Sequence, residues 1–121
     1  MNPLRGWYER SLFPWLHDRF VSLPVLERLR AEGLVAARGR LVEIGFGTGL
    51  NLPHYPAAMT SLAAVEINSG MLRRAAPRIK AFPVPVEVVA AAAEQLPFQD
   101  GAFDTAVSFL TLCSVADPGR A

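Results

Sequence analysis

The chain has 121 residues, of which 51% are hydrophobic and 19% charged, and its formal net charge is +1. This length suits one domain with one core, and the composition is ordinary for a soluble globular protein. Because the arginines are spread along the chain and the charge is nearly balanced, we expect no nucleic-acid partner.

The cysteine and histidine counts limit the chemistry further. One cysteine, Cys113, and two histidines are present, which permits no internal disulfide and no standard zinc site, so we expect no bound metal and treat Cys113 as a buried apolar side chain. No apolar run reaches the roughly 18 residues of a spanning helix, and charges stand where a signal peptide has its apolar core. We therefore expect a cytoplasmic protein without stable membrane insertion.

Residues 3–37 predict a helical prelude. Apolar side chains recur at helical spacing from Leu4 to Leu16. We expect Pro14 and Pro24 to break this run into short helices, since proline lacks a backbone donor.

The pattern changes to strands from residue 40. Apolar segments bounded by turn residues predict four short strands, at 41–44, 61–67, 86–90 and 103–109. A helix capped by Asn68 or Ser69 lies between the second and third, with Pro77 as a point where it should bend or stop. Strands this apolar on both faces suit a parallel sheet, so we predict a doubly wound α/β domain over residues 40–121 that follows a helical segment over residues 1–39.

Three glycines in alternate positions follow the first predicted strand. Gly45, Gly47 and Gly49 stand where a chain leaving a parallel strand turns sharply and lets its backbone approach a ligand. We expect a helix to open around residues 50–55, with its free amides and positive dipole end toward that ligand.

An acidic residue ends the second predicted strand. Glu66 lies 21 residues after Gly45, at about the spacing where a carboxylate grips a ribose diol. A nicotinamide or flavin dinucleotide would require Gly-x-Gly-x-x-Gly, and the last position of that pattern falls on Leu50. The observed Gly-x-Gly-x-Gly disfavours an NAD-dependent oxidoreductase, while an ordinary tight turn beside a solvated strand end remains the alternative.

With Glu43 the loop becomes acidic-x-Gly-x-Gly-x-Gly, and here the chain resembles class I S-adenosylmethionine-dependent methyltransferases. The likeness is closest to the type 11 group that acts on ubiquinone, menaquinone or phospholipids. Three segments carry it: VEIGFGTGLNLPHY from residue 42, AVEINSGMLRRA from residue 64 and AEQLPFQDGAFDTAV from residue 93. The resemblance implies a Rossmann-like sheet of order 3-2-1-4-5-7-6 and S-adenosylmethionine as cofactor.

The resemblance also implies the roles of particular residues. The glycine loop would hold the methionyl part of the cofactor, Glu66 the ribose, and the residues after the third strand the adenine. Ala92 stands where the family usually has an acidic residue, so the backbone of Ala92 and Ala93, or the side chain of Glu94, would contact the base instead. The end of the fourth strand, where ligands of open α/β sheets bind, adds Ser108. The implied cofactor-binding residues are Glu43, Gly45, Gly47, Gly49, Glu66, Ala92, Ala93 and Ser108.

No catalytic residue is assigned, because methyl transfer is a displacement that the protein promotes by positioning. A general base matters only if the acceptor must lose a proton, and the candidates are His17, His54, Tyr8 and Tyr55.

The chain ends soon after the fourth predicted strand, so we expect a sheet truncated there, with an apolar edge at residues 103–109 that leads either to self-association or to poor solubility. The sequence thus predicts the N-terminal cofactor-binding portion of a methyltransferase for a small-molecule or lipid-like acceptor. The alternative is a non-catalytic binding module. The aromatic and arginine residues of the prelude would cover the active site or lie on a membrane surface.

Overall fold

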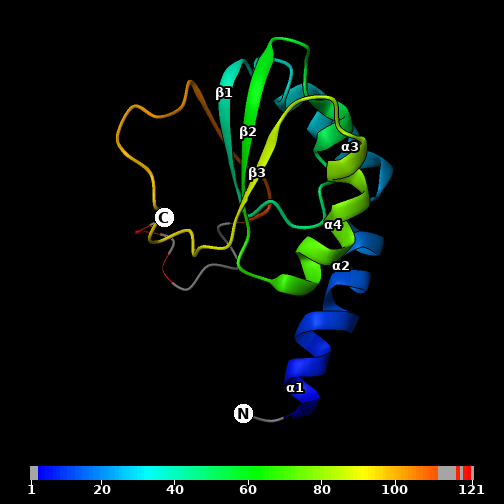
Figure 1. Ribbon diagram of the computed structural model, residues 1–121. Coiled ribbons are helices and arrows are strands. Elements are labelled where there is room, and N and C mark those ends of the chain that lie inside the picture. The colour runs from blue at the N-terminus through cyan, green and yellow to red at the C-terminus, as the bar shows by residue number, and fades with distance from the viewer. Residues whose placement is uncertain (1–2, 112–116, 118, 121) are drawn as a thin grey trace.

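The computed structural model describes residues 3–111, 117, 119 and 120, and its centre is a parallel four-stranded sheet (Figure 1). The strands are β1 (Gly39–Ile44), β2 (Met59–Val65), β3 (Val86–Val89) and β4 (Thr105–Ser108), in the order β3-β2-β1-β4. This confirms the predicted α/β class and the predicted order of these strands. Cys113 lies outside the described residues.

The register brings the carboxyl ends of the strands to one level. Ile44 pairs with Val65 on one side and with Ser108 on the other, and Val65 pairs with Val89. Because β2 ends at Val65, Glu66 is the first residue beyond the sheet. Residues that follow the four strands are therefore neighbours in space, although they are far apart in sequence.

The two faces of the sheet are covered differently. The helix α4 (Ser69–Ala81) packs on one face, where Leu41, Leu62 and Ala75 are almost completely buried. Burial on this scale contributes roughly 2 kcal/mol for each leucine. The other face packs against the coil between β3 and β4, in which Phe98 and Phe103 meet edge to face at 4.8 Å.

The helix α4 begins as the sequence predicts. The Asn68 side chain accepts hydrogen bonds from the amides of Gly70 and Met71 at 2.8 and 3.2 Å, which satisfies two donors of the first turn. Pro77 does not end the helix, which continues to Ala81.

The helix predicted over residues 50–55 is wrong. The structure has one short 3₁₀-helix there, Leu52–His54. Pro53 has no amide to donate, and Pro56 disfavours a helical conformation at Tyr55, whose backbone is extended. The loop therefore offers turn amides rather than the N-terminus of a long helix.

The prelude is more continuous than predicted. Its elements are α1 (Pro3–Trp7), a π-helical turn (Tyr8–Leu12), α2 (Phe13–Val21) and α3 (Pro24–Gly33). The break expected at Pro14 is wrong, because Pro14 occupies the second position of α2, where its missing amide costs little. The break at Pro24 is confirmed, since Pro24 starts α3.

Close backbone contacts join the prelude to the start of α4. The Asn68 side-chain amide donates to the carbonyl of Glu9 at 2.9 Å, and Arg73 donates to the carbonyl of Arg10 at 3.1 Å. A methyl group on Gly70 would lie 2.1 Å from that same Arg10 carbonyl oxygen. Glycine at position 70 thus permits the close approach of the two segments.

Candidate functional site

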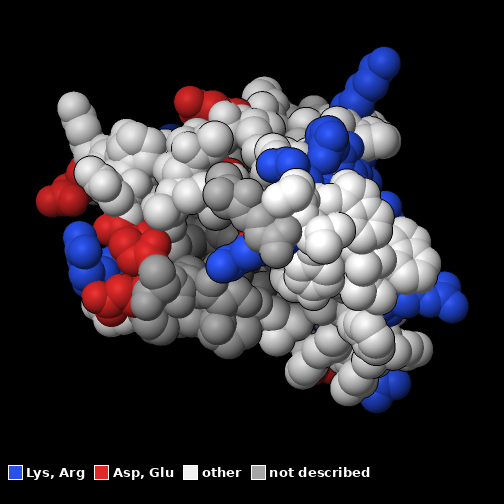
Figure 2. All heavy atoms as spheres, turned by 90° about the horizontal axis from the view of Figure 1, so that it is seen from below, with Lys and Arg blue, Asp and Glu red and all other residues white. Residues whose placement is uncertain are grey.

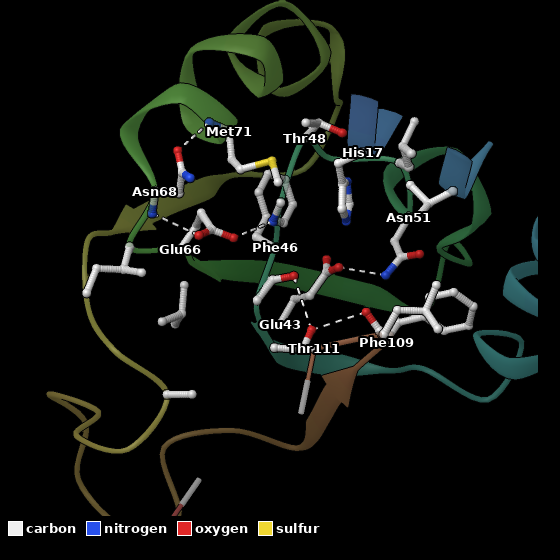
Figure 3. Close-up of a pocket in the computed structure, with 18 of the residues that line it drawn as sticks. His17, Glu43, Phe46, Thr48, Asn51, Glu66, Asn68, Met71, Phe109 and Thr111 are labelled. Carbon is white, nitrogen blue, oxygen red and sulfur yellow. Dashed lines mark hydrogen bonds between the residues drawn. The ribbon is translucent and has the colours of Figure 1, made fainter. Parts of the chain in front are cut away.

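A cavity of about 250 Å³ lies at the carboxyl ends of the strands, between the sheet and the prelude (Figure 3). The prelude, the glycine loop, the region after β2 and the segment after β4 all contribute to its wall. The lining side chains that carry polar groups are those of His17, Arg30, Glu43, Thr48, Asn51, Glu66, Asn68 and Thr111. This is the edge of an open α/β sheet where ligands bind.

Two positions in the loop after β1 carry glycine for different structural reasons. Both have positive φ angles, +72° at Gly45 and +62° at Gly47. A side chain on Gly45 would also collide with Thr111, whose hydroxyl donates to the carbonyl of Ile44 at 3.1 Å. On Gly47 the nearest atom would be Cε1 of His17, at 3.8 Å. Gly47 therefore leaves its surface open toward the cavity.

Backbone amides orient the carboxylate of Glu66. Its Oε2 accepts from the amide of Gly47 at 2.9 Å, and its Oε1 accepts from the amide of Asn68 at 2.8 Å. A carboxylate has about four acceptor positions, so each oxygen retains one for a ligand. This arrangement holds two acceptors side by side on the cavity wall, as a vicinal diol requires.

The carboxyl group of Glu43 is completely buried beneath the loop. It accepts from the Asn51 side chain at 2.6 Å and from the Tyr55 hydroxyl at 2.8 Å. Burial, partly offset by these two hydrogen bonds, raises the pKa of Glu43 to about 7. Burial also raises the pKa of Tyr55, followed in importance by the charge of Glu43, so the hydroxyl keeps its proton and donates.

A buried arginine of α3 continues this network. Arg30 is 3% exposed, and its Nε donates to the Asn51 side-chain oxygen at 3.0 Å. Its Nη1 donates to Glu27 at 2.6 Å and to the carbonyl of Val21 at 2.7 Å. The guanidinium also lies over the ring of Phe109 at 5.0 Å. Arg30 thus links α3 to the glycine loop and to the segment after β4.

A second buried charge joins α2 to the loop and to α4. Asp18 is 7% exposed and accepts a hydrogen bond from the Thr48 hydroxyl. Two arginines of α4 approach the same carboxylate, Arg74 at 2.9 Å and Arg78 at 3.4 Å. Arg78 also donates to the carbonyl of Thr48 at 2.7 Å. The middle of the glycine loop is therefore held from the prelude side.

His17 of the prelude also lines the cavity, and Figure 3 shows its ring near Phe46 and Asn51. Its Nδ1 is buried and has no hydrogen-bond partner among the described residues. Burial lowers the pKa of this imidazole, although the nearby carboxylates of Asp18 and Glu66 oppose the shift. The ring also packs against Phe13, with the ring centroids 5.9 Å apart.

The cavity brings together part of the predicted site. Glu43, Gly45, Gly47, Glu66 and Ala93 line it. The wall as described does not include the other three predicted residues, namely Gly49, Ala92 and Ser108.

The residues next to these three explain the difference. Gly49 turns toward the core beside Phe46 and Leu52. Ala91 and Ala93 line the cavity on either side of Ala92, and Phe109, Leu110 and Thr111 line it directly after Ser108. The contacts of these predicted residues with a cofactor remain predictions.

Glu94, the predicted substitute for the missing acidic residue, does not line the described cavity. Its Oε1 accepts a hydrogen bond from the amide of Asp117 at 2.9 Å. The contact of Glu94 with the adenine, like that of the backbone of Ala92 and Ala93, stays a prediction.

The candidate bases differ in their positions. His54 lies outside the described cavity wall and pairs with Glu27 at 2.7 Å. Tyr8 is 43% exposed, and the Tyr55 hydroxyl donates to Glu43. Of the four candidates, His17 is the one that lines the cavity.

Several residues of the site were not predicted from the sequence. Arg30 and Asp18 belong to predicted helices, and no motif there distinguished a buried charge from a solvated one. Asn51 lies within the glycine-loop segment that supports the resemblance, so its position was a usable signal. Thr111 lies beyond the predicted fourth strand, and its contact with Gly45 depends on the fold.

Residues 42–121 match the family model for a type 11 methyltransferase domain. The chain belongs to this family. Its cofactor is accordingly S-adenosylmethionine.

A curated relative supports membership of the type 11 family. The chain is 35% identical over 96 residues to a phosphatidylethanolamine N-methyltransferase of Cereibacter sphaeroides, and the match covers 77% of this chain and 47% of the relative. The chain thus spans about half the length of the curated relative it matches.

Solved structures share the fold. An S-adenosylmethionine-dependent methyltransferase from Clostridium acetobutylicum superposes with a TM-score of 0.69 and 14% identity, over 89% of this chain and 47% of that one. The cyclase SpnF superposes with a TM-score of 0.64 and 28% identity, over 79% of this chain and 37% of that one. Since one of these structures is named as a cyclase, likeness of fold alone does not fix the reaction.

Proposed function

We propose that residues 40–121, together with the helical segment 1–39, form the cofactor-binding portion of an S-adenosylmethionine-dependent methyltransferase. The carboxylate of Glu66 is the observation that carries the proposal. Two backbone amides fix it at the end of β2, with one acceptor position left on each oxygen. The open surface of Gly47 and the unpaired Nδ1 of His17 also fit a polar ligand in this cavity.

In this proposal each part of the cofactor lies beyond a different strand. Glu66 binds the two ribose hydroxyls at the end of β2. The adenine lies toward Ala91 and Ala93 beyond β3, where Ile67, 68% exposed, provides apolar surface. The methionyl part lies over Gly47, beyond β1.

The bound cofactor supplies a methyl group that its sulfonium activates for displacement. The chain's own contribution is to hold the cofactor between the loop and the prelude and to limit access of water. Phe13 and Phe109 form apolar parts of the wall. An amine acceptor must reach this cavity with a free electron pair on nitrogen.

Calorimetric titration with S-adenosylhomocysteine tests the proposal. We expect binding to the 121-residue chain and loss of at least tenfold in affinity on Glu66→Ala, because hydrogen bonds to a carboxylate contribute about 1.5–3 kcal/mol each. Glu87→Gln on β3 is the matched control, since Glu87 is exposed. Equal affinities of the Glu66→Ala variant and the wild type would contradict the ribose assignment, and binding of NAD alone would favour the oxidoreductase alternative.

For the acceptor we propose a small molecule or lipid-like amine. The name of the Cereibacter sphaeroides relative supports a phospholipid head group. Large apolar side chains of the prelude are also exposed: Trp7 by 57%, Trp15 by 50% and Phe20 by 65%. Figure 2 shows an uncharged area with Lys and Arg side chains at its margins on the end of the molecule seen from below. Such a combination suits an anionic lipid surface.

Flotation with vesicles tests the lipid-like acceptor. We expect the chain to float with vesicles that contain anionic phospholipid, and Trp7→Ala and Trp15→Ala together to reduce that fraction several-fold. The helices in the described part of the chain are all too short or too polar to cross a membrane, so binding would be peripheral. Recovery of the wild-type chain only in the soluble fraction would favour a small soluble acceptor.

Two predictions remain part of this proposal. The first is a cytoplasmic location, which the single cysteine fits, and the second is self-association through the edge of β4. A non-catalytic binding module is the alternative function, and cofactor binding without methyl transfer to any acceptor by the complete protein would favour it.

A further inference from the structure

Arg30 of α3 is a buried cation whose donors are only partly used by the protein. A guanidinium carries five N–H donors, one on Nε and two on each Nη. Nε donates to Asn51 at 3.0 Å, and Nη1 donates to Glu27 at 2.6 Å and to the carbonyl of Val21 at 2.7 Å. The two donors of Nη2 have no acceptor among the described residues.

Nη2 of Arg30 keeps a surface that a ligand can contact. In the described part of the chain, Nδ1 of His17 is the one side-chain nitrogen or oxygen that is both fully buried and without a hydrogen-bond partner. Nη2 also has no partner, so it is not fully buried. Because Arg30 is 3% exposed and lines the cavity, this small accessible surface belongs to the cavity wall.

Arg30 lies at the β4 end of the cavity. Its guanidinium carbon is 5.0 Å from the centroid of the Phe109 ring, and Phe109 directly follows β4. Figure 3 shows Phe109 and Glu66 on opposite sides of the cavity. The proposed function uses the ends of β3, β2 and β1 for the cofactor, which leaves the end of β4 for the methyl acceptor.

We propose that Arg30 is an acceptor-binding residue whose Nη2 donates to a phosphate oxygen of the methyl acceptor. The inference rests on the proposed function and narrows its acceptor to an amine that carries a phosphate group. The amine nitrogen must keep its electron pair for the methyl group, so it does not accept from the guanidinium. A phosphate oxygen is an anionic acceptor that suits this donor, and holding it orients the amine.

The pairing of Arg30 with Glu27 limits binding of other anions. Nη1 already donates to this carboxylate, so the two side chains together add little net charge to the cavity. A free phosphate ion should therefore bind weakly. An acceptor that also places its amine in the cavity should bind more tightly.

Two amines that differ by a phosphate group test this assignment. Phosphoethanolamine and ethanolamine carry the same primary amine. Calorimetric titration of the wild-type chain saturated with S-adenosylhomocysteine should show at least tenfold tighter binding of phosphoethanolamine than of ethanolamine or of inorganic phosphate, the ratio expected for one hydrogen bond to a charged group. Equal affinities for the two amines, or no binding of phosphoethanolamine, would overturn the assignment. Equal affinities for phosphoethanolamine and inorganic phosphate would make the site a general anion site and overturn it as well.

The variant Arg30→Lys keeps a positive charge beside Glu27 but removes Nη2. It should bind phosphoethanolamine about tenfold more weakly than the wild type, and ethanolamine within about twofold of the wild-type value. Arg28→Lys is the matched control on the same helix, because Arg28 is exposed, and it should retain both wild-type affinities.

Titration of Arg30→Lys with S-adenosylhomocysteine separates the acceptor from the cofactor. We expect an affinity within about threefold of the wild-type value. A tenfold loss would give Arg30 a role in cofactor binding or packing and overturn the assignment, as would unchanged binding of phosphoethanolamine. If this variant does not fold, the comparison of ligands on the wild type still decides. The Glu66→Ala result tests the proposed function separately, whereas failure of the wild type to bind S-adenosylhomocysteine overturns both.

Discussion

At the scale of the single residue, Glu43 is a carboxyl group that the fold removes almost completely from water. Its carboxyl group is buried, and its pKa is raised from 4.5 to about 7. The folded state therefore binds a proton more tightly than the unfolded state does. Stability from this group is fully present below pH 4.5 and is lost as the pH rises through about 7.

Because the stability contributed by Glu43 falls as the pH rises, the variant Glu43→Gln should respond differently to pH. The amide preserves the shape of the side chain, still accepts from Asn51 and does not ionise. Between pH 4.5 and 8 the wild type should lose up to about 3 kcal/mol of unfolding free energy through Glu43, and the variant should not. Urea denaturation across this pH range measures the difference.

The exposed residue Glu87 again provides the control for this experiment. Glu87→Gln removes one carboxylate without removing a buried one, so its pH profile should follow that of the wild type. Parallel profiles for the wild type and Glu43→Gln would mean that Glu43 titrates normally in the folded protein.

Residues of the site could be predicted where they belong to a short sequence motif with a known structural role. Gly45, Gly47 and Glu66 lie in motifs whose spacing follows from the turn after a strand, and the structure places all three on the cavity wall. Arg30 and Asp18 were not predictable in this way. Their burial depends on how the prelude docks, which no spacing within one helix reports.

At the scale of the element, the positions of the prolines explain two opposite errors. One is a predicted helix that does not form, and the other is a predicted helix break that is absent. Pro53 and Pro56 limit the predicted helix to a 3₁₀ turn, because one lacks a donor and the other restricts the residue before it. Pro14 fails to break the prelude because it falls within the first turn of α2, directly after a π-helical turn. The effect of proline depends on its position in the turn, which composition does not give.

The strands were predicted better than the helices. Each predicted strand overlaps the observed one, since an apolar segment between turn residues has few alternatives to a buried strand. Their ends differ by up to two residues. The predicted cap at Asn68 was found because its side-chain chemistry is local.

At the scale of the whole molecule, the site depends on contacts between the prelude and the sheet. Phe13, His17 and Val21 of the prelude line the same cavity as the glycine loop. Asp18 pairs with arginines of α4, and Arg30 reaches Asn51. The boundary predicted at residue 39 therefore separates two segments of sequence that share one binding cavity. A change at their junction should affect ligand binding without touching the ligand.

Gly70→Ala tests this dependence. The added methyl group would meet the Arg10 carbonyl oxygen at 2.1 Å, a backbone atom that moves only with the prelude. We expect a loss of about 1–3 kcal/mol in stability, faster proteolysis within residues 3–21 and weaker binding of S-adenosylhomocysteine. Limited proteolysis and calorimetry measure these effects. Gly33→Ala is the matched control, because no atom lies within 4 Å of its added methyl group. If Gly70→Ala retains both the proteolysis pattern and the affinity of the wild type, the prelude does not hold the cofactor site in place.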